Sequence, residues 1–133
     1  MNDAADDRDW IDFEWATIRL VPSVHREEFV NVGVVLHARR AEFLDVRIEV
    51  PWERVDAIGP ALDRAAIERH LAAFERIARG DARAGEVALL PPSERFHWLT
   101  APRSAIIQPS DRRPGRDHDL SATLARLFRE QCG

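Results

Sequence analysis

Apolar and polar residues alternate along the stretch from Glu28 to Leu36, the clearest pattern in the sequence. Alternation with a period of two, built largely from β-branched residues, predicts a β-strand. One face of this strand would be aliphatic and would lie on a core: Val30, Val32, Val34 and Leu36. The other face holds Asn31 and Gly33, which weaken a strand, because Gly lacks a side chain and Asn competes for backbone hydrogen bonds. We expect a β-bulge or a binding site here, and a bulge without a ligand is the favoured interpretation.

Two further segments, residues 13–21 and 43–50, show the same alternation. Their aliphatic faces comprise Ala16, Ile18 and Leu20 in the first segment and Leu44, Val46, Ile48 and Val50 in the second. Because the connections are short, the three segments predict an antiparallel meander. The second face of this sheet is mixed and carries Trp15, Thr17, Arg19, Val35, Asp45, Arg47 and Glu49. We expect a solvent-exposed face with cross-strand ion pairs; the alternative is a shallow polar site or partner surface centred on Asn31 and Gly33.

Apolar residues at helical spacing predict the remaining elements. The clearest helix begins after the N-cap residue Asp63 and runs to about Arg79, with Gly80 just past its end. Its apolar stripe comprises Ile67, Leu71, Phe74, Ile77 and Ala78. Other segments are expected as helices at residues 51–58, 94–100 and from Asp117 or Asp119 onwards, as short strands at 87–90 and 105–108, and as an exposed loop at 110–116. The predicted fold class is α+β: an antiparallel β-meander of three to four strands with helices packed on one face.

The length of 133 residues fits one domain. Four of the first nine residues are aspartates, so residues 1–12 are predicted to be an acidic disordered tail and residues 13–133 a single α+β domain. The formal net charge of −4 argues against broad nucleic-acid binding, which needs a basic face. A single cysteine, Cys132, with no apolar run of transmembrane length and no signal peptide, predicts a cytoplasmic protein.

No residue pattern in the sequence identifies a reaction. The five histidines (His25, His37, His70, His97 and His118) have no spacing typical of a metal site, and no phosphate-binding loop or nucleophile motif is present. We therefore predict no catalytic residue, no metal and no cofactor. One basic grouping remains: Arg103, Arg112, Arg113 and Arg116. Because every basic residue of the chain is Arg, a solvated surface loop is favoured over a phosphate-binding patch in this region.

Two stretches carry a resemblance to a known bacterial family. Residues 17–22 and 26–36 form an Arg-containing strand that ends in Pro, followed by Glu-Phe-x-Asn-Val-Gly, and residues 96–104 read Phe-His-Trp-Leu-Thr-Ala-Pro-Arg-Ser. Together with the leucine-rich final helix, they resemble the family catalogued as domain of unknown function 3037. The resemblance picks out Arg19, Glu28, Asn31, Gly33 and Arg103. Its members are often encoded beside a kinase-like protein similar to the HipA toxin kinases, so the resemblance also implies a kinase-like partner.

The function predicted on these grounds is that of a non-enzymatic accessory or interaction protein, with a HipA-like kinase as the partner that the resemblance implies. The lack of any catalytic constellation favours this hypothesis. One alternative is a small-molecule-binding protein or enzyme with a site around Asn31 and Gly33, to which Arg19 and Glu28 would contribute. Another is a nucleic-acid-associated protein that uses the Arg103–Arg116 region. No membrane association is expected.

Overall fold

Five strands and four α-helices follow one another along the chain in the computed structural model, which describes residues 9–23, 26–59, 61–103 and 105–133. The strands are β1 (Ile11–Ser23), β2 (Glu28–Ala38), β3 (Phe43–Ile48), β4 (Ile107–Pro109) and β5 (Arg113–Asp117). The helices are α2 (Trp52–Ile58), α3 (Arg64–Arg79), α4 (Pro92–Leu99) and α5 (Leu120–Cys132), and two short 3₁₀ helices lie at Ala82–Ala84 and Glu86–Leu89. None of the helices in these ranges is long and apolar enough to cross a membrane.

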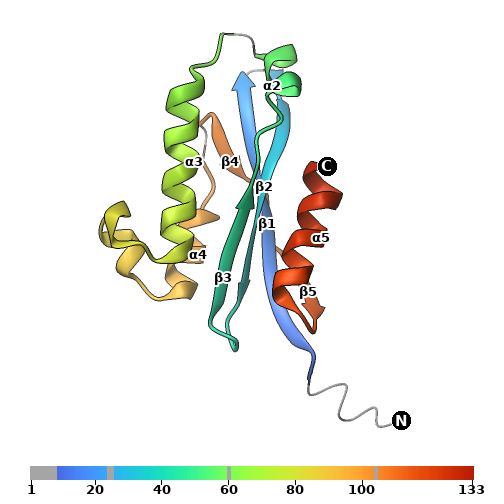
Figure 1. Cartoon of the computed structure of the whole chain (residues 1–133), viewed down its shortest axis with the longest axis vertical. Coiled ribbons are helices and arrows are strands. Elements are labelled where there is room, and N and C mark those ends of the chain that lie inside the picture. The colour runs from blue at the N-terminus through green and yellow to red at the C-terminus, as the bar shows by residue number, and fades with distance from the viewer. Residues whose placement is uncertain (1–8, 24–25, 60, 104) are drawn as a thin grey trace.

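All five strands join one antiparallel sheet, so the predicted α+β class is confirmed (Figure 1). The first three strands form the predicted meander, in the order β3-β2-β1. The free edge of β1 is long enough to pair with two short strands, β4 along residues 18–20 and β5 along residues 11–15. The strand β5 falls in a segment predicted to be a loop, because its residues, Arg-Pro-Gly-Arg-Asp, carry no apolar alternation.

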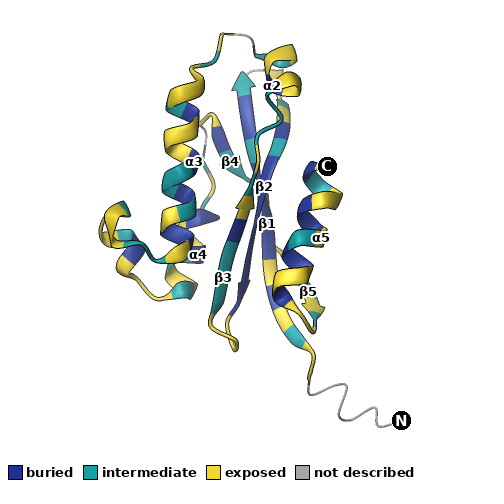
Figure 2. Ribbon diagram, in the orientation of Figure 1, coloured by how far each residue is buried: buried dark blue, intermediate teal, exposed yellow. Residues whose placement is uncertain are grey.

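Helices cover both faces of the sheet, which corrects the prediction that they pack on one face (Figure 1). On one side, α3 and α4 pack on a core that includes Ala16, Ile18, Leu20, Val32, Val35, Val46 and Phe96. On the other side, α5 packs on a second core that includes Phe13, Trp15, Val34, Leu36 and Phe128. Figure 2 shows the buried residues along the central strands and on the sides of α3 and α5 that face them. The second sheet face is therefore covered by a helix, and the expected solvent-exposed face is wrong.

The predicted bulge lies in the middle of β2. Asn31 is opposite Arg19, whereas Gly33 is opposite Ile18, so Val32 is an extra residue that β1 does not match. An extra residue shifts the side-chain alternation by one position and exchanges the two faces of the strand. Before the bulge, the even-numbered residues of β2 therefore face the α3 core, and after it the odd-numbered residues do.

The four aliphatic residues predicted to share one face of β2 are divided between the two cores. Val30 and Val32 precede the end of the bulge and contact the α3 core, whereas Val34 and Leu36 contact the α5 core. The prediction of a continuous aliphatic face was wrong because it assumed an unbroken period of two. The aliphatic face of β3 is as predicted, since Val46 is buried in the α3 core with Leu44, Ile48 and Val50 packed against it.

The helix α3 matches its prediction closely. The side chain of Asp63 accepts a hydrogen bond from the Ala66 N–H at 3.1 Å, and Gly80 takes the left-handed conformation with φ of 72°. Both features satisfy backbone groups at the helix ends. The buried residues are those of the predicted stripe.

Some boundaries differ from the predictions. The strand β1 begins at Ile11, inside the range assigned to the tail, and residues 1–8 of that tail lie outside the described residues. The strand expected at 87–90 is instead largely a 3₁₀ helix.

Candidate functional site

The sequence-predicted residues Arg19 and Asn31 meet beneath the C-terminal end of α5. They are direct partners across β1 and β2. The Asn31 Nδ2 group donates a hydrogen bond to the Gln131 carbonyl oxygen at 3.0 Å, and the Arg19 guanidinium lies over the Phe29 ring at 4.3 Å from its centre. The family pattern thus marks a contact between the sheet and the final helix.

Gly33 lies where two backbones come close together. A Cβ atom at this position would be 2.8 Å from the Arg47 carbonyl oxygen and 2.9 Å from Cγ1 of Ile48. Real Cβ atoms do not approach backbone oxygens at that distance, so the bulge needs a residue without a side chain here. Packing of β2 against β3 accounts for this glycine.

The other two predicted residues lie apart from that contact. Glu28 begins β2 and forms an ion pair of 2.7 Å with Arg26 at the surface. Arg103 follows α4 and donates to two carbonyl oxygens of that helix, Trp98 at 2.7 Å and Leu99 at 3.1 Å. The structure therefore brings Arg19, Asn31 and Gly33 together on adjacent strands and places Arg103 elsewhere.

Three buried polar atoms near the bulge have no hydrogen-bond partner among the described residues: Thr17 Oγ1, Arg19 Nε and Asn31 Oδ1. All three belong to the part of β1 and β2 around the contact of Arg19 with Asn31. The expected cross-strand ion pairs are also wrong, since within the described ranges Arg19, Arg47 and Glu49 pair neither with one another nor with Asp45. Arg47 instead lies over the Phe128 ring of α5 at 5.3 Å.

The four arginines of the predicted basic grouping serve separate contacts. Arg103 caps α4, Arg112 lines a cavity beside α4, and Arg113 lies over the Trp15 ring at 5.3 Å. Arg116 forms an ion pair of 2.7 Å with Asp12. The four arginines therefore do not share one contact.

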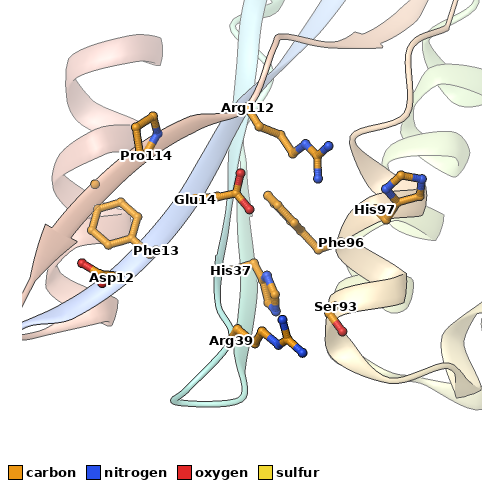
Figure 3. A pocket seen from close by; sticks show the side chains of 11 residues that line it. Asp12, Phe13, Glu14, His37, Arg39, Ser93, Phe96, His97, Arg112 and Pro114 are labelled. Atoms are coloured by element: carbon orange, nitrogen blue, oxygen red, sulfur yellow. The ribbon is translucent and has the colours of Figure 1, made fainter.

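A polar cavity of about 670 Å³ opens between the sheet and α4, and we call it the polar cleft (Figure 3). Its lining comes from β1, β2, β5, α4 and their connections: Asp12, Phe13, Glu14, His37, Arg39, Ser93, Phe96, His97, Arg112, Pro114 and Gly115. Its volume lies in the range typical of small-molecule sites. Acidic, basic and aromatic side chains from distant parts of the chain converge here.

Glu14 and His37, which are direct partners on β1 and β2, both line the polar cleft. The imidazole of His37 is only 7% exposed and stacks on the Phe96 ring, with 5.0 Å between the ring centres. Burial lowers the pKa of His37, the nearby Glu14 carboxylate raises it, and Arg39 and Arg95 lower it further. His37 is therefore neutral at pH 7 and can donate or accept a hydrogen bond.

Two guanidinium groups stand at the polar cleft without a carboxylate partner. Among the described residues, Arg39 and Arg112 form no ion pair and no side-chain hydrogen bond. Figure 3 shows Arg112 extending towards His97 and Arg39 extending towards Ser93, with Glu14 between the two arginines. The cleft therefore presents unpaired donors on its α4 side.

Sequence reasoning missed the polar cleft as a site. The sequence pattern does not distinguish Glu14, Arg39 or Ser93 from other polar residues, and the spacing of His37 bears only on a metal site. An unbroken alternation in β2 puts His37 on the face of Asn31, whereas the bulge moves it to the face of Glu14. Asn31 and Gly33 predict a bulge at this place, but the prediction of the two faces does not carry its one-residue shift along the rest of β2.

A second cavity, of about 590 Å³, lies between α3, α4 and the segment before β4, and we call it the apolar groove. It is lined by Leu62, Asp63, Ala66, Ile67, His70, Phe74, Trp98, Arg103, Ala105, Ile106 and Ile107. Two of its large apolar side chains remain open to solvent, Trp98 at 37% and Ile106 at 42%. Burial of Arg103 beside them lowers the pKa of its guanidinium.

No group of three or more His, Cys, Asp or Glu residues in the described part of the chain could hold a metal ion. The fold and its cavities define a small α+β domain with a polar cleft and an apolar groove beside one helix, α4. The chain belongs to the family described as a protein of unknown function (DUF3037), whose model matches residues 15–132. No curated protein and no solved structure matches the chain.

Proposed function

We propose that this protein is a non-enzymatic interaction protein that binds a partner protein through the apolar groove. The observation that carries the proposal is the exposure of Trp98 and Ile106 at the mouth of a cavity whose walls are largely apolar. Apolar side chains gathered around a concavity are typical of surfaces that bury a partner's side chain. Ile67 and Phe74 extend this surface inwards from α3.

The side chain of Trp98 is held in place before any partner binds. The Phe74 ring meets it edge-on at 6.1 Å between centres, and the Arg103 guanidinium lies over it at 4.5 Å. Arg103 is itself fixed by its two hydrogen bonds to the end of α4. Trp and Arg are the residues most enriched among those that dominate binding energy, and fixing them beforehand reduces the entropy lost on binding.

The partner that we propose is a kinase-like protein similar to the HipA kinases, and the proposed location of the complex is the cytoplasm. The support for this partner is the family to which the chain belongs, since its members are often encoded beside such a kinase. The support for an interaction role comes from the groove itself. In this proposal Arg103, one of the two family positions that lie apart from the bulge, contributes by orienting Trp98.

The test is capture of the tagged protein with its partner from its own cells, and then reconstitution with the purified kinase-like protein. Ile106→Asp places a charge at the mouth of the groove and is expected to abolish the complex. Leu89→Asp is the matched control, because Leu89 is 68% exposed and does not line the groove. Trp98→Ala is expected to weaken the complex, whereas Trp10→Ala, at a tryptophan of similar exposure, is expected to leave it intact. A complex that survives Ile106→Asp would overturn the proposal.

A further inference from the structure

We infer that the apolar groove also binds a small amphiphile, a carboxylic acid with an aliphatic chain, whose carboxylate pairs with Arg103. The basis is the combination of one guanidinium that lacks a carboxylate partner with walls that are otherwise largely apolar. Binding of this acid is independent of the proposed partner protein. Its consequence, that the acid and the partner exclude each other, rests on the proposed function, because both occupants cover Trp98 and Ile106.

The groove follows one side of α3. The helix and its N-cap contribute lining residues at positions i, i+3, i+4, i+7 and i+11, which share one helix face: Asp63, Ala66, Ile67, His70 and Phe74. The distance from Asp63 to Phe74 corresponds to about 16 Å along the helix axis. An extended chain advances about 1.2 Å per bond, so an acid of about ten to twelve carbons spans this length.

The positive charge lies at the Phe74 end of the groove, because the Arg103 guanidinium carbon is 5.1 Å from the centre of the Phe74 ring. Of the described residues that line the groove, Arg103 alone carries a permanent positive charge, and it forms no ion pair with any described residue. Burial is the cause of its lowered pKa, and no carboxylate offsets that effect. A bound carboxylate supplies the opposite charge that favours the ionised guanidinium.

Arg103 keeps donors for a ligand after its contacts with α4. A guanidinium has up to five N–H donors, and the carbonyl oxygens of Trp98 and Leu99 use two of them. The remaining donors can form charge-assisted hydrogen bonds with a carboxylate. The two bonds to α4 also hold the guanidinium in place before the acid binds, which reduces the entropy lost on binding.

The aliphatic chain has exposed apolar surface to cover. Trp98 and Ile106 are 37% and 42% exposed, and Leu62 near the start of α3 is half-buried. Covering these side chains with an alkyl chain removes apolar surface from water on both molecules. An acid group placed at the Leu62 end would lie near the Asp63 carboxylate, so the charges favour the direction in which the acid group meets Arg103.

The test is isothermal titration of the full-length protein with butyrate, octanoate, decanoate and 1-octanol, each below its limit of solubility or micelle formation. We expect decanoate to bind several-fold more tightly than octanoate for each added CH₂ group, and butyrate to show no binding. The neutral 1-octanol should bind about tenfold or more weakly than octanoate, since it lacks the charge that pairs with Arg103.

Arg103→Gln is expected to weaken octanoate binding about tenfold or more and to leave 1-octanol binding nearly unchanged. This comparison is needed because Arg103 also orients Trp98: a change in the shape of the groove weakens both compounds, whereas loss of the charge weakens octanoate alone. Arg103→Lys keeps the charge and should bind octanoate more tightly than Arg103→Gln. Arg69→Gln is the matched control, because Arg69 is an exposed arginine of α3 that does not line the groove. Thermal melting checks that each variant is folded.

Absence of decanoate binding, equal binding of octanoate and 1-octanol, an equal loss of both compounds in Arg103→Gln, or a similar loss in Arg69→Gln would overturn the inference. These titrations need no partner, so the inference and the proposed function can fail separately. Saturating decanoate is expected to displace the kinase-like protein from its complex with the wild-type chain. A complex that persists with decanoate bound would overturn the mutual exclusion.

Discussion

The side-chain amide of Asn31 donates to the carbonyl oxygen of Gln131 at 3.0 Å, so the bulge of β2 holds the last turn of α5. Arg54 of α2 acts in the same way, with a hydrogen bond of 3.0 Å from its guanidinium to the Cys132 carbonyl oxygen. The last carbonyl groups of a helix have no intrahelical donor, and these two side chains satisfy them. Three elements that are distant in sequence therefore meet at the C-terminal end of α5.

Replacing Asn31 with Ala should lower the free energy of unfolding by about 1–3 kcal/mol, because a partly buried carbonyl of α5 loses its donor. Urea denaturation followed by circular dichroism measures this change. Gln108→Ala is the matched control, since the Gln108 amide donates at the surface to a carbonyl only three residues away. Wild-type stability in the Asn31 variant, combined with loss of a ligand or partner, would instead assign Asn31 to a binding site.

Replacing Gly33 with Ala should destabilise the protein by about 1–3 kcal/mol, the usual cost of overpacking. The added Cβ would lie 2.8 Å from the Arg47 carbonyl oxygen, and a backbone atom of a paired strand cannot move aside as a side chain can. Thermal and urea unfolding give the magnitude. A variant with unchanged stability would show that β2 and β3 separate at this point without cost, contrary to the close approach described above.

The bulge also explains why the helix α3 could be predicted from the sequence and the polar cleft could not. The limits and buried stripe of α3 depend on local signals, namely Asp63, Gly80 and an apolar period close to 3.6. The cleft depends on one extra residue in β2, which puts His37 and Asn31 on opposite faces although both are odd-numbered. A strict period of two leaves them on the same face and hides the pairing of His37 with Glu14.

The position of α5 is the other feature that the sequence left open. Its apolar stripe predicts that it packs on a core, but the stripe does not specify which face of the sheet it covers. That face is set by Phe13, Trp15, Val34 and Leu36, and two of these residues change sides with the bulge. With the one-residue shift of the bulge included, Val34 and Leu36 join Phe13 and Trp15 on the second face of the sheet. That face is then apolar enough to require a covering helix.

Lowering the pH should destabilise the protein through His37. Burial holds the pKa of His37 below its usual 6.5, so the unfolded chain takes up a proton before the folded chain does. The free energy of unfolding should therefore fall as the pH drops below 6.5, by at most about 1.4 kcal/mol per pH unit from this residue, until the folded pKa is passed. His37→Gln is expected to remove that part of the pH dependence.

Nuclear magnetic resonance titration of the His37 ring tests the cause of this shift. Glu14→Gln should lower the pKa of His37 further, because the carboxylate favours the imidazolium, and Arg39→Gln should raise it. Opposite shifts in the two variants would establish that both charges face the ring. Shifts of the same sign in the two variants would show that Glu14 and Arg39 do not both act on the His37 ring as the structure places them.

Cys132 should make the protein less stable at alkaline pH. Burial raises the pKa of its thiol from 9.0 to about 11, whereas the nearby Arg54 acts in the opposite direction. The unfolded thiol ionises first, so the free energy of unfolding should fall by about 1–3 kcal/mol as the pH rises from 9 towards 11. The sequence contains neither Tyr nor Lys, so no other side chain is expected to titrate strongly in this window.

Urea denaturation at pH 8, 9, 10 and 11 measures this loss, with Cys132→Ala as the control in which the alkaline slope should disappear. At pH 8 the folded thiol should react slowly with a disulfide reagent, because the thiolate is the reactive form and the side chain is only 7% exposed. Asn31→Ala and Arg54→Ala should both speed this reaction, since each frees the end of α5. Fast labelling of the wild-type thiol would mean that the end of α5 opens readily, and the anchoring by Asn31 and Arg54 would then be too weak to hold it.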